Sequence, residues 1–99
     1  RGSIPASYYQ PVKSDVPVLM LSGALDPATP AQFAPPAAQS LPNSRQVLIP
    51  NEAHSYGSDC LRNLIAEFIA KGSAKDLDTS CVELSRRSRF ATELPARFK

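Results

Sequence analysis

The pattern of apolar residues predicts two strands and one well-formed helix. Residues 16–22 are nearly all apolar without alternation, which is typical of a strand covered on both faces of a parallel sheet. Residues 45–49 predict a second, shorter strand. From about Asp59 to Lys71 the apolar positions repeat with the spacing of one helical face, and Ser58 or Asp59 can cap the start. The apolar positions of this helix are Leu61, Leu64, Ile65, Phe68 and Ile69.

The segment between the two strands has a weaker helical signal. Residues 23–27 are predicted to form a loop. Thr29 as N-cap and Pro30 at the first helical position predict the start of a helix that runs to about residue 41. Pro35 and Pro36 interrupt this helix, so we expect it to kink or to split into two short turns.

The order strand, helix, strand, helix predicts one right-handed βαβ crossover with a covering helix. Two parallel strands do not form a stable sheet alone, because parallel strands need neighbours and cover on both faces. We therefore expect an α/β fold with an incomplete sheet, which belongs to a larger sheet or packs against another chain. In this division residues 1–15 are a turn-rich N-terminal segment, residues 16–81 hold the α/β unit and residues 82–99 form a basic tail.

Length and charge exclude several classes of protein. A chain of 99 residues forms one small domain at most, and no run approaches the ~20 apolar residues of a membrane span. The net charge of +2 comes from residues 82–99, which hold five Lys or Arg and two Asp or Glu. The cluster Arg86-Arg87-Ser88-Arg89 could contact an acidic surface or nucleic acid, but we interpret it as a solvated face. The sequence has no zinc-type Cys/His cluster and no RNP-like aromatic pattern, so we expect no metal, cofactor or nucleic acid.

An acid and a base follow the two predicted strands. Asp26 follows the first strand and directly precedes Pro27, and His54 lies in the loop after the second. Ligand sites of open α/β sheets lie at the carboxyl ends of strands, and neighbouring strands are about 4.8 Å apart. The two side chains can therefore meet, and a carboxylate on one ring nitrogen leaves the other to take a proton from a nucleophile. Alternatively, Asp26 is an ordinary turn residue and His54 an ordinary surface residue.

The two cysteines flank the second predicted helix. Cys60 lies at its start, Gly72 can end it, and residues 73–81 can run back so that Cys81 approaches Cys60. A disulfide there closes a loop of about 20 residues and contributes roughly 3 kcal/mol by constraining the unfolded chain. We favour this disulfide, which indicates an oxidising compartment, over two buried free thiols or a reactive Cys60 at a helix N-terminus.

Three stretches carry a family resemblance: PVLMLSGALDPATP (17–30), LPNSRQVLIPNEAHS (41–55) and CLRNLIAEFIAKGSAKDLDTSC (60–81). Together they resemble the C-terminal, TAP-like (tripeptidyl-aminopeptidase-like) region of α/β-hydrolase serine peptidases of the proline iminopeptidase type. The resemblance implies that this chain is a C-terminal fragment of an α/β-hydrolase fold. It implies that Asp26 is the triad acid and His54 the triad base, in the order acid before His. It also implies the Cys60–Cys81 disulfide and a secreted or periplasmic exopeptidase that releases residues from peptide N-termini.

The chain departs from that family mainly in what it lacks. No segment reads Gly-x-Ser-x-Gly, and no oxyanion-hole segment is present. Pro35-Pro36 interrupts a helix that is usually more regular, and Ala53 precedes His54 where many α/β-hydrolases have Gly. We therefore expect the nucleophilic serine on the N-terminal portion of the same hydrolase or on a complementing chain. This chain alone is expected to be inactive.

Two other functions are compatible with the sequence. The first is a non-catalytic α/β module that binds a protein partner, or forms homo-oligomers, through the open edge of its sheet. The second is a catalytic remnant in which Ser55 or Ser58 acts as nucleophile beside His54.

Overall fold

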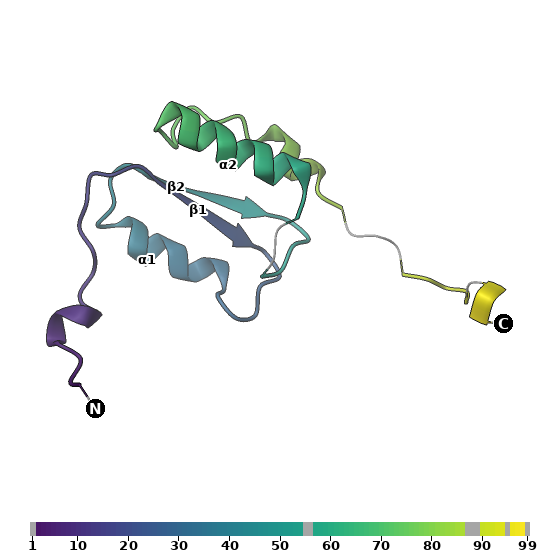
Figure 1. The fold of residues 1–99 in the computed structure, drawn as a ribbon, viewed down its shortest axis with the longest axis horizontal. Helices are drawn as coiled ribbons and strands as arrows, with labels where there is room; N and C mark the ends of the chain where they lie inside the picture. Colours follow the sequence, from purple (N-terminus) through teal and green to yellow (C-terminus); the bar gives the residue numbers. More distant parts are fainter. Residues whose placement is uncertain (1, 55–56, 87–89, 95, 99) are drawn as a thin grey trace.

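The computed structural model contains one pair of parallel strands between two helices (Figure 1). Strands β1 (Val18–Gly23) and β2 (Ser44–Ile49) pair in register from one end to the other. Helix α1 (Ala34–Ala38) lies on one side of the strands and helix α2 (Asp59–Lys71) on the other (Figure 1). This arrangement confirms the expected α/β fold with an incomplete sheet. The structure describes residues 2–54, 57–86, 90–94 and 96–98.

The first predicted strand is shifted, and the second is one residue longer. Residues 16 and 17 lie outside β1, and Gly23, which was expected to open the following loop, is the last residue of the strand. β2 begins at Ser44, one residue before the predicted start. The register places Val18 opposite Ser44 and Gly23 opposite Ile49, so both strands end at the same level. The loops that follow them therefore start side by side.

The segment between the strands splits as its prolines predict. A 3₁₀ turn, η2 (Ala31–Phe33), precedes α1, whose first turn contains Pro35 and Pro36. Prolines are tolerated there because the first N–H groups of a helix have no intrahelical acceptor. The prediction of Thr29 as N-cap and Pro30 as first helical residue is wrong. Pro30 is itself the N-cap of η2, and the Thr29 hydroxyl bonds to an aspartate instead.

Helix α2 has the predicted bounds and both predicted caps. The Ser58 hydroxyl oxygen accepts from the N–H of Leu61, so Ser58 rather than Asp59 caps the start. Gly72 ends the helix with a φ of 63°, a left-handed conformation that glycine adopts without strain, and its N–H donates to the carbonyl of Phe68.

The hydrophobic core lies between β2, α2 and the chain that follows α2. Ile49 at its centre is only 1% exposed. Other residues of the predicted apolar helix face remain accessible, because Ile65 is 39% and Ile69 72% exposed. Part of the apolar face of α2 therefore has no cover within the described residues. The buried core residues are Val47, Ile49, Leu61, Leu64, Leu77 and Val82.

A disulfide joins Cys60 at the start of α2 to Cys81 in the 3₁₀ helix η3 (Ser80–Leu84). The bond closes a loop in which the chain runs along α2, reverses at Gly72 and returns to the start of the helix. It holds η3 against the core, where Val82 is buried. The pairing is the one favoured from the sequence.

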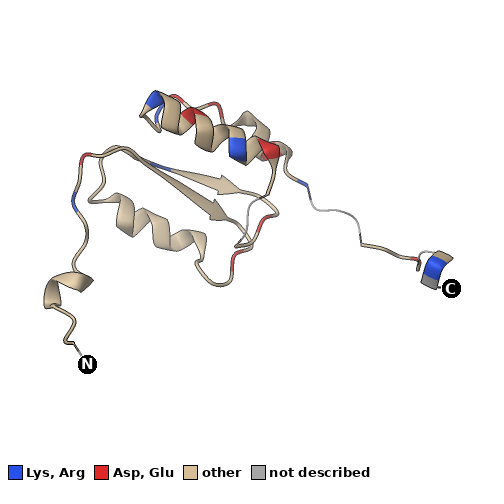
Figure 2. Cartoon of the chain, viewed as in Figure 1, with Lys and Arg blue, Asp and Glu red and all other residues tan. Residues whose placement is uncertain are grey.

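Charged side chains are unevenly distributed over the two helices. Figure 2 shows residues of both signs on α2 and none on α1. The segments with η1 (Ala6–Tyr9) and η4 (Ala96–Phe98) extend away from the strands and helices (Figure 1). Within the described residues, no helix has the length and apolar character needed to cross a membrane.

Arg45 on β2 holds the loop that follows α2. Its guanidinium group donates to the carbonyl oxygens of Leu77 at 3.0 Å, of Ala74 and Lys75 at 3.3 Å, and to the Thr79 hydroxyl at 3.3 Å. The planar fork of arginine can reach several acceptors at once. This one side chain therefore connects the sheet to the return segment.

We predict that Arg45→Lys lowers the free energy of unfolding by about 1–2 kcal/mol, because a single ammonium group cannot replace this set of hydrogen bonds. Urea denaturation followed by circular dichroism measures the change. The matched control is Arg62→Lys, since Arg62 pairs with Asp59 on the exposed surface of α2, where an ion pair contributes little. Equal stabilities of the two variants would contradict this role of Arg45.

Candidate active site

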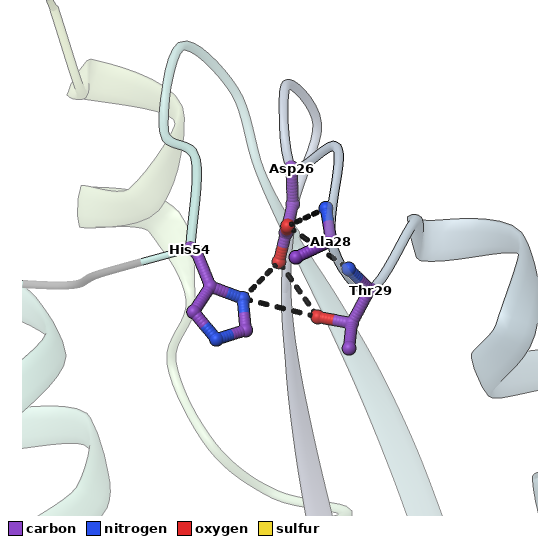
Figure 3. Close-up of polar contacts among 4 residues, drawn as sticks. All are labelled: Asp26, Ala28, Thr29 and His54. Atoms are coloured by element: carbon purple, nitrogen blue, oxygen red, sulfur yellow. Dashed lines mark hydrogen bonds and ion pairs between the residues drawn. The ribbon is translucent and has the colours of Figure 1, made fainter.

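The loops after β1 and β2 are hydrogen-bonded to each other. The N–H of Ala24 donates to the carbonyl of Ile49 at 3.0 Å, and the N–H of Leu25 donates to that of Glu52 at 2.9 Å. These bonds continue the contact between the strands beyond their last residues. Asp26 in the first loop and His54 in the second are thereby brought together, with 2.9 Å between Asp26 Oδ2 and His54 Nδ1 (Figure 3).

Gly23 allows the two loops to approach so closely. A Cβ atom at this position would lie 2.1 Å from the carbonyl oxygen of Ala53 and 2.6 Å from that of Glu52. Both contacts are far shorter than side chains tolerate. The sequence analysis missed this role of Gly23. The available signal was a glycine at the end of an apolar strand, which often marks a close backbone approach.

The Asp26 carboxylate is buried and accepts four hydrogen bonds from described residues. Its side chain is 1% exposed. Oδ1 accepts from the N–H of Ala28 at 2.8 Å and of Thr29 at 3.0 Å, and Oδ2 accepts from the Thr29 hydroxyl at 2.7 Å and from His54 (Figure 3). Asp26 is therefore both a turn residue and a partner of His54, the two interpretations considered from the sequence. One oxygen closes a local turn, and the other reaches the histidine of the next loop.

These contacts keep Asp26 ionised. Burial on its own would raise the pKa of the carboxyl group. The Thr29 N–H, the Thr29 hydroxyl, His54 and the Ala28 N–H all favour the charged form, and together they hold the pKa of Asp26 well below its usual range. The carboxylate is therefore a permanent negative charge beside the imidazole at neutral pH.

His54 has one nitrogen on the carboxylate and one directed away from it. The side chain is 65% exposed, and Nε2 points away from Asp26 (Figure 3). A neutral imidazole that donates from Nδ1 to a carboxylate keeps its lone pair on Nε2. In this arrangement His54 can take a proton at Nε2, and Asp26 can stabilise the resulting imidazolium.

Thr29 is a member of this cluster that the sequence analysis misassigned. Its hydroxyl oxygen lies 2.7 Å from Asp26 Oδ2 and 3.2 Å from His54 Nδ1 (Figure 3). A threonine followed by proline after a loop has the appearance of a helix cap. Its position three residues after the acid was the signal that could have placed its hydroxyl on the carboxylate instead.

Both loops are anchored from outside the cluster. Gln46 Nε2 donates to the Ala31 carbonyl at 2.9 Å and to the buried Ser22 hydroxyl at 3.0 Å, which fixes the chain just after Thr29. On the other side, Asn51 Nδ2 donates to the Ser85 carbonyl at 3.2 Å, and the Ser85 hydroxyl donates to Glu52 at 3.4 Å. The second loop is therefore attached to the segment that follows η3.

The described residues supply neither a nucleophile at His54 nor a metal site. Ser58 caps α2, and Ser55, the other candidate nucleophile, lies outside the described residues. No group of three or more His, Cys, Asp or Glu suited to a metal ion occurs in the described ranges. In the basic cluster, Arg86 donates to the carbonyls of Glu83 and Ser85, and residues 87–89 lie outside the described part of the chain.

A comparison with protein families finds a match over most of the chain. The model of a family described as TAP-like protein matches residues 3–81. The matched range contains both strands, both α-helices, Asp26, His54 and both cysteines. No curated protein and no solved structure matches the chain.

We predict that Gly23→Ala displaces the loop of residues 51–54, because a Cβ would collide with two backbone carbonyls. His54 then loses its contact with Asp26, and the free energy of unfolding falls by about 1–3 kcal/mol. Since His54 is the only histidine, its NMR signals report the displacement directly. Gly57→Ala is the matched control, because a Cβ there meets nothing within 4 Å. Unchanged His54 signals in Gly23→Ala would refute the tight fit.

A second prediction concerns the pH dependence of stability. The pKa of Asp26 is lower in the folded state than its unfolded value of about 3.9, so its ionised form stabilises the fold. This contribution is fully present above the unfolded pKa and is lost as the pH falls through the folded pKa. Asp26→Asn lacks it. The difference in free energy of unfolding between wild type and Asp26→Asn is therefore expected to shrink as the pH falls from 7 towards 3. A difference independent of pH would contradict the prediction.

Proposed function

The chain belongs to the TAP-like family of α/β-hydrolases, and we propose that it supplies the acid and the base of a serine hydrolase triad. The observation that carries the proposal is the bond between the buried, ionised Asp26 and Nδ1 of the exposed His54, at the carboxyl ends of two parallel strands. In such a triad Asp26 orients the imidazole, and His54 Nε2 removes the proton of the serine nucleophile.

The direction of His54 Nε2, away from Asp26, supports the following reaction. As the serine oxygen attacks a carbonyl carbon, its proton passes to His54 Nε2, and the new imidazolium is stabilised by Asp26. The same proton then passes to the leaving amine. A water molecule deprotonated by His54 hydrolyses the acyl-enzyme, which restores the serine. Asp26 remains ionised throughout, in accord with its lowered pKa.

We place the serine on an N-terminal region of the same hydrolase or on a complementing chain. The 99 residues contain no Gly-x-Ser-x-Gly segment, and β1 pairs with β2 along one edge, without a further strand in the described ranges. A hollow of about 330 Å³ beside Thr29 is lined by Met20, Leu21 and Phe33, among others, and Phe33 is 64% exposed. This uncovered apolar surface suits the continuation of the sheet.

In this proposal residues 16–81 form the hydrolase segment, preceded by an N-terminal segment and followed by the tail 82–99.

We further propose that the complete enzyme is a secreted or periplasmic exopeptidase that releases residues from the N-termini of peptides. The family membership supports the hydrolase chemistry. The Cys60–Cys81 disulfide is compatible with an extracellular location, because such bonds persist in oxidising compartments.

A module that only binds a protein partner would explain the uncovered apolar surface equally well. It would not require a buried carboxylate with four donors, one of them the only histidine of the chain. The acid–base pair therefore favours the hydrolase over the binding module.

The test uses the polypeptide that joins these residues to a hydrolase region with a Gly-x-Ser-x-Gly segment. Asp26→Asn is expected to lower kcat by about 10⁴-fold, and His54→Ala to abolish labelling by a serine-directed fluorophosphonate. Asp76→Asn, at an exposed position, is the matched control and should retain activity. The 99-residue chain alone should not be labelled. Full activity of the Asp26 and His54 variants would refute the triad, and equal cleavage of N-acetylated and free peptides would refute the exopeptidase.

A further inference from the structure

The Thr29 hydroxyl lies between the acid and the base. It is 2.7 Å from Asp26 Oδ2 and 3.2 Å from His54 Nδ1, so the three side chains form a closed triangle of polar contacts (Figure 3). We propose that Thr29 is a positioning residue that holds His54 in the tautomer protonated at Nδ1 and fixes the direction of its ring. This role in catalysis rests on the function proposed above.

The single hydroxyl proton of Thr29 is committed to the carboxylate. At 2.7 Å from an ionised oxygen, the hydroxyl makes a short, charge-assisted hydrogen bond to Asp26 Oδ2. With its proton directed there, the Thr29 oxygen can offer only lone pairs to its other neighbours. Towards His54 Nδ1 it is therefore an acceptor.

Two acceptors thus converge on Nδ1 of His54. A proton on Nδ1 is shared between Asp26 Oδ2 at 2.9 Å and the Thr29 oxygen at 3.2 Å. In the other tautomer, the Nδ1 lone pair would face a carboxylate and a hydroxyl lone pair with no proton between them. This repulsion disfavours a proton on Nε2. Thr29 therefore helps to keep Nε2 unprotonated, which is the form that a general base needs.

The second acceptor also restricts rotation of the ring. His54 is largely exposed, so packing contributes little to its orientation. A single bond to Asp26 would allow the imidazole to pivot about that bond. A second contact on the same nitrogen, from a different direction, limits the pivot. A misplacement of a catalytic group by about 1 Å can lower the reaction rate by about 10²-fold. The restriction on ring rotation therefore matters, because it fixes the position of Nε2.

Thr29 is itself held in place. Its N–H donates to Asp26 Oδ1 at 3.0 Å while its hydroxyl donates to Oδ2, so one residue contacts both carboxylate oxygens. The following segment is tied to β2 through Gln46 and the Ala31 carbonyl. A β-branched side chain is also stiff about its first torsion. The hydroxyl is therefore organised before any substrate binds.

The direct test is the protonation pattern of His54 in ¹⁵N-histidine-labelled chain, where it is the only histidine. In the neutral imidazole of the wild type we expect a proton on Nδ1 and none on Nε2. Thr29→Val, which replaces the hydroxyl by a methyl group of similar size, should shift the equilibrium towards Nε2–H, and Thr29→Ser should restore it. Thr79→Val is the matched control, since it removes a threonine hydroxyl that bonds to Arg45 instead. A wild-type chain protonated at Nε2, or a Thr29→Val variant with the wild-type pattern, overturns the proposal.

Kinetics of the nucleophile-bearing polypeptide give a second, separate measurement. Thr29→Val should lower kcat by about 10²-fold with little change in KM, and Thr29→Ser should recover most of the loss. If Asp26→Asn and His54→Ala retain activity, the triad is wrong, whereas the NMR pattern still decides the role of Thr29 in the tautomer. If those two variants lose activity and Thr29→Val does not, the triad stands and the positioning role is refuted.

Discussion

The site depends on the hydrogen bonds that the buried Asp26 carboxylate accepts. A buried charge is costly unless it is well paired, and here both oxygens are occupied by donors from two different loops. The donors from Ala28 and Thr29 are local, so the turn after β1 forms around the carboxylate. The donor from His54 is remote in sequence. One side chain therefore closes its own loop and also fixes the loop of the neighbouring strand.

This contact is formed only because the backbone brings the two loops within reach. Gly23 removes the side chain that would collide with the carbonyls of residues 52 and 53. Behind the His54 loop, Asn51 and Glu52 are bonded to Ser85, in the segment after η3, and η3 is held by the Cys60–Cys81 disulfide. The disulfide is thus connected to the histidine loop through a short chain of contacts, in addition to its effect on the unfolded state.

Sequence reasoning succeeded where the physical signal is local or periodic. The helix Asp59–Lys71 follows from its apolar spacing and its caps, and the pair Asp26–His54 follows from the rule that strand ends share one edge of a sheet. It failed for Thr29, because a hydroxyl before proline can serve either a helix end or a nearby carboxylate. Arg45 and Gln46 were missed because many of their acceptors are backbone carbonyls, which leave no residue-specific mark in a sequence. The exposure of Ile69 was also missed, because helical spacing identifies an apolar face but not which of its positions are covered.

The acid–base pair is complete without the nucleophile that it is proposed to serve. Among the described residues, every donor to Asp26 comes from the two strand-end loops, and none of these bonds needs the open edge of β1 to be covered. His54 keeps Nε2 on the side away from Asp26, on an exposed side chain. In the proposed triad, a serine that arrives there meets a base already oriented by Asp26 and Thr29. Assembly of the triad then requires only that the sheet place the serine oxygen, because the proton acceptor has no further reorganisation to make.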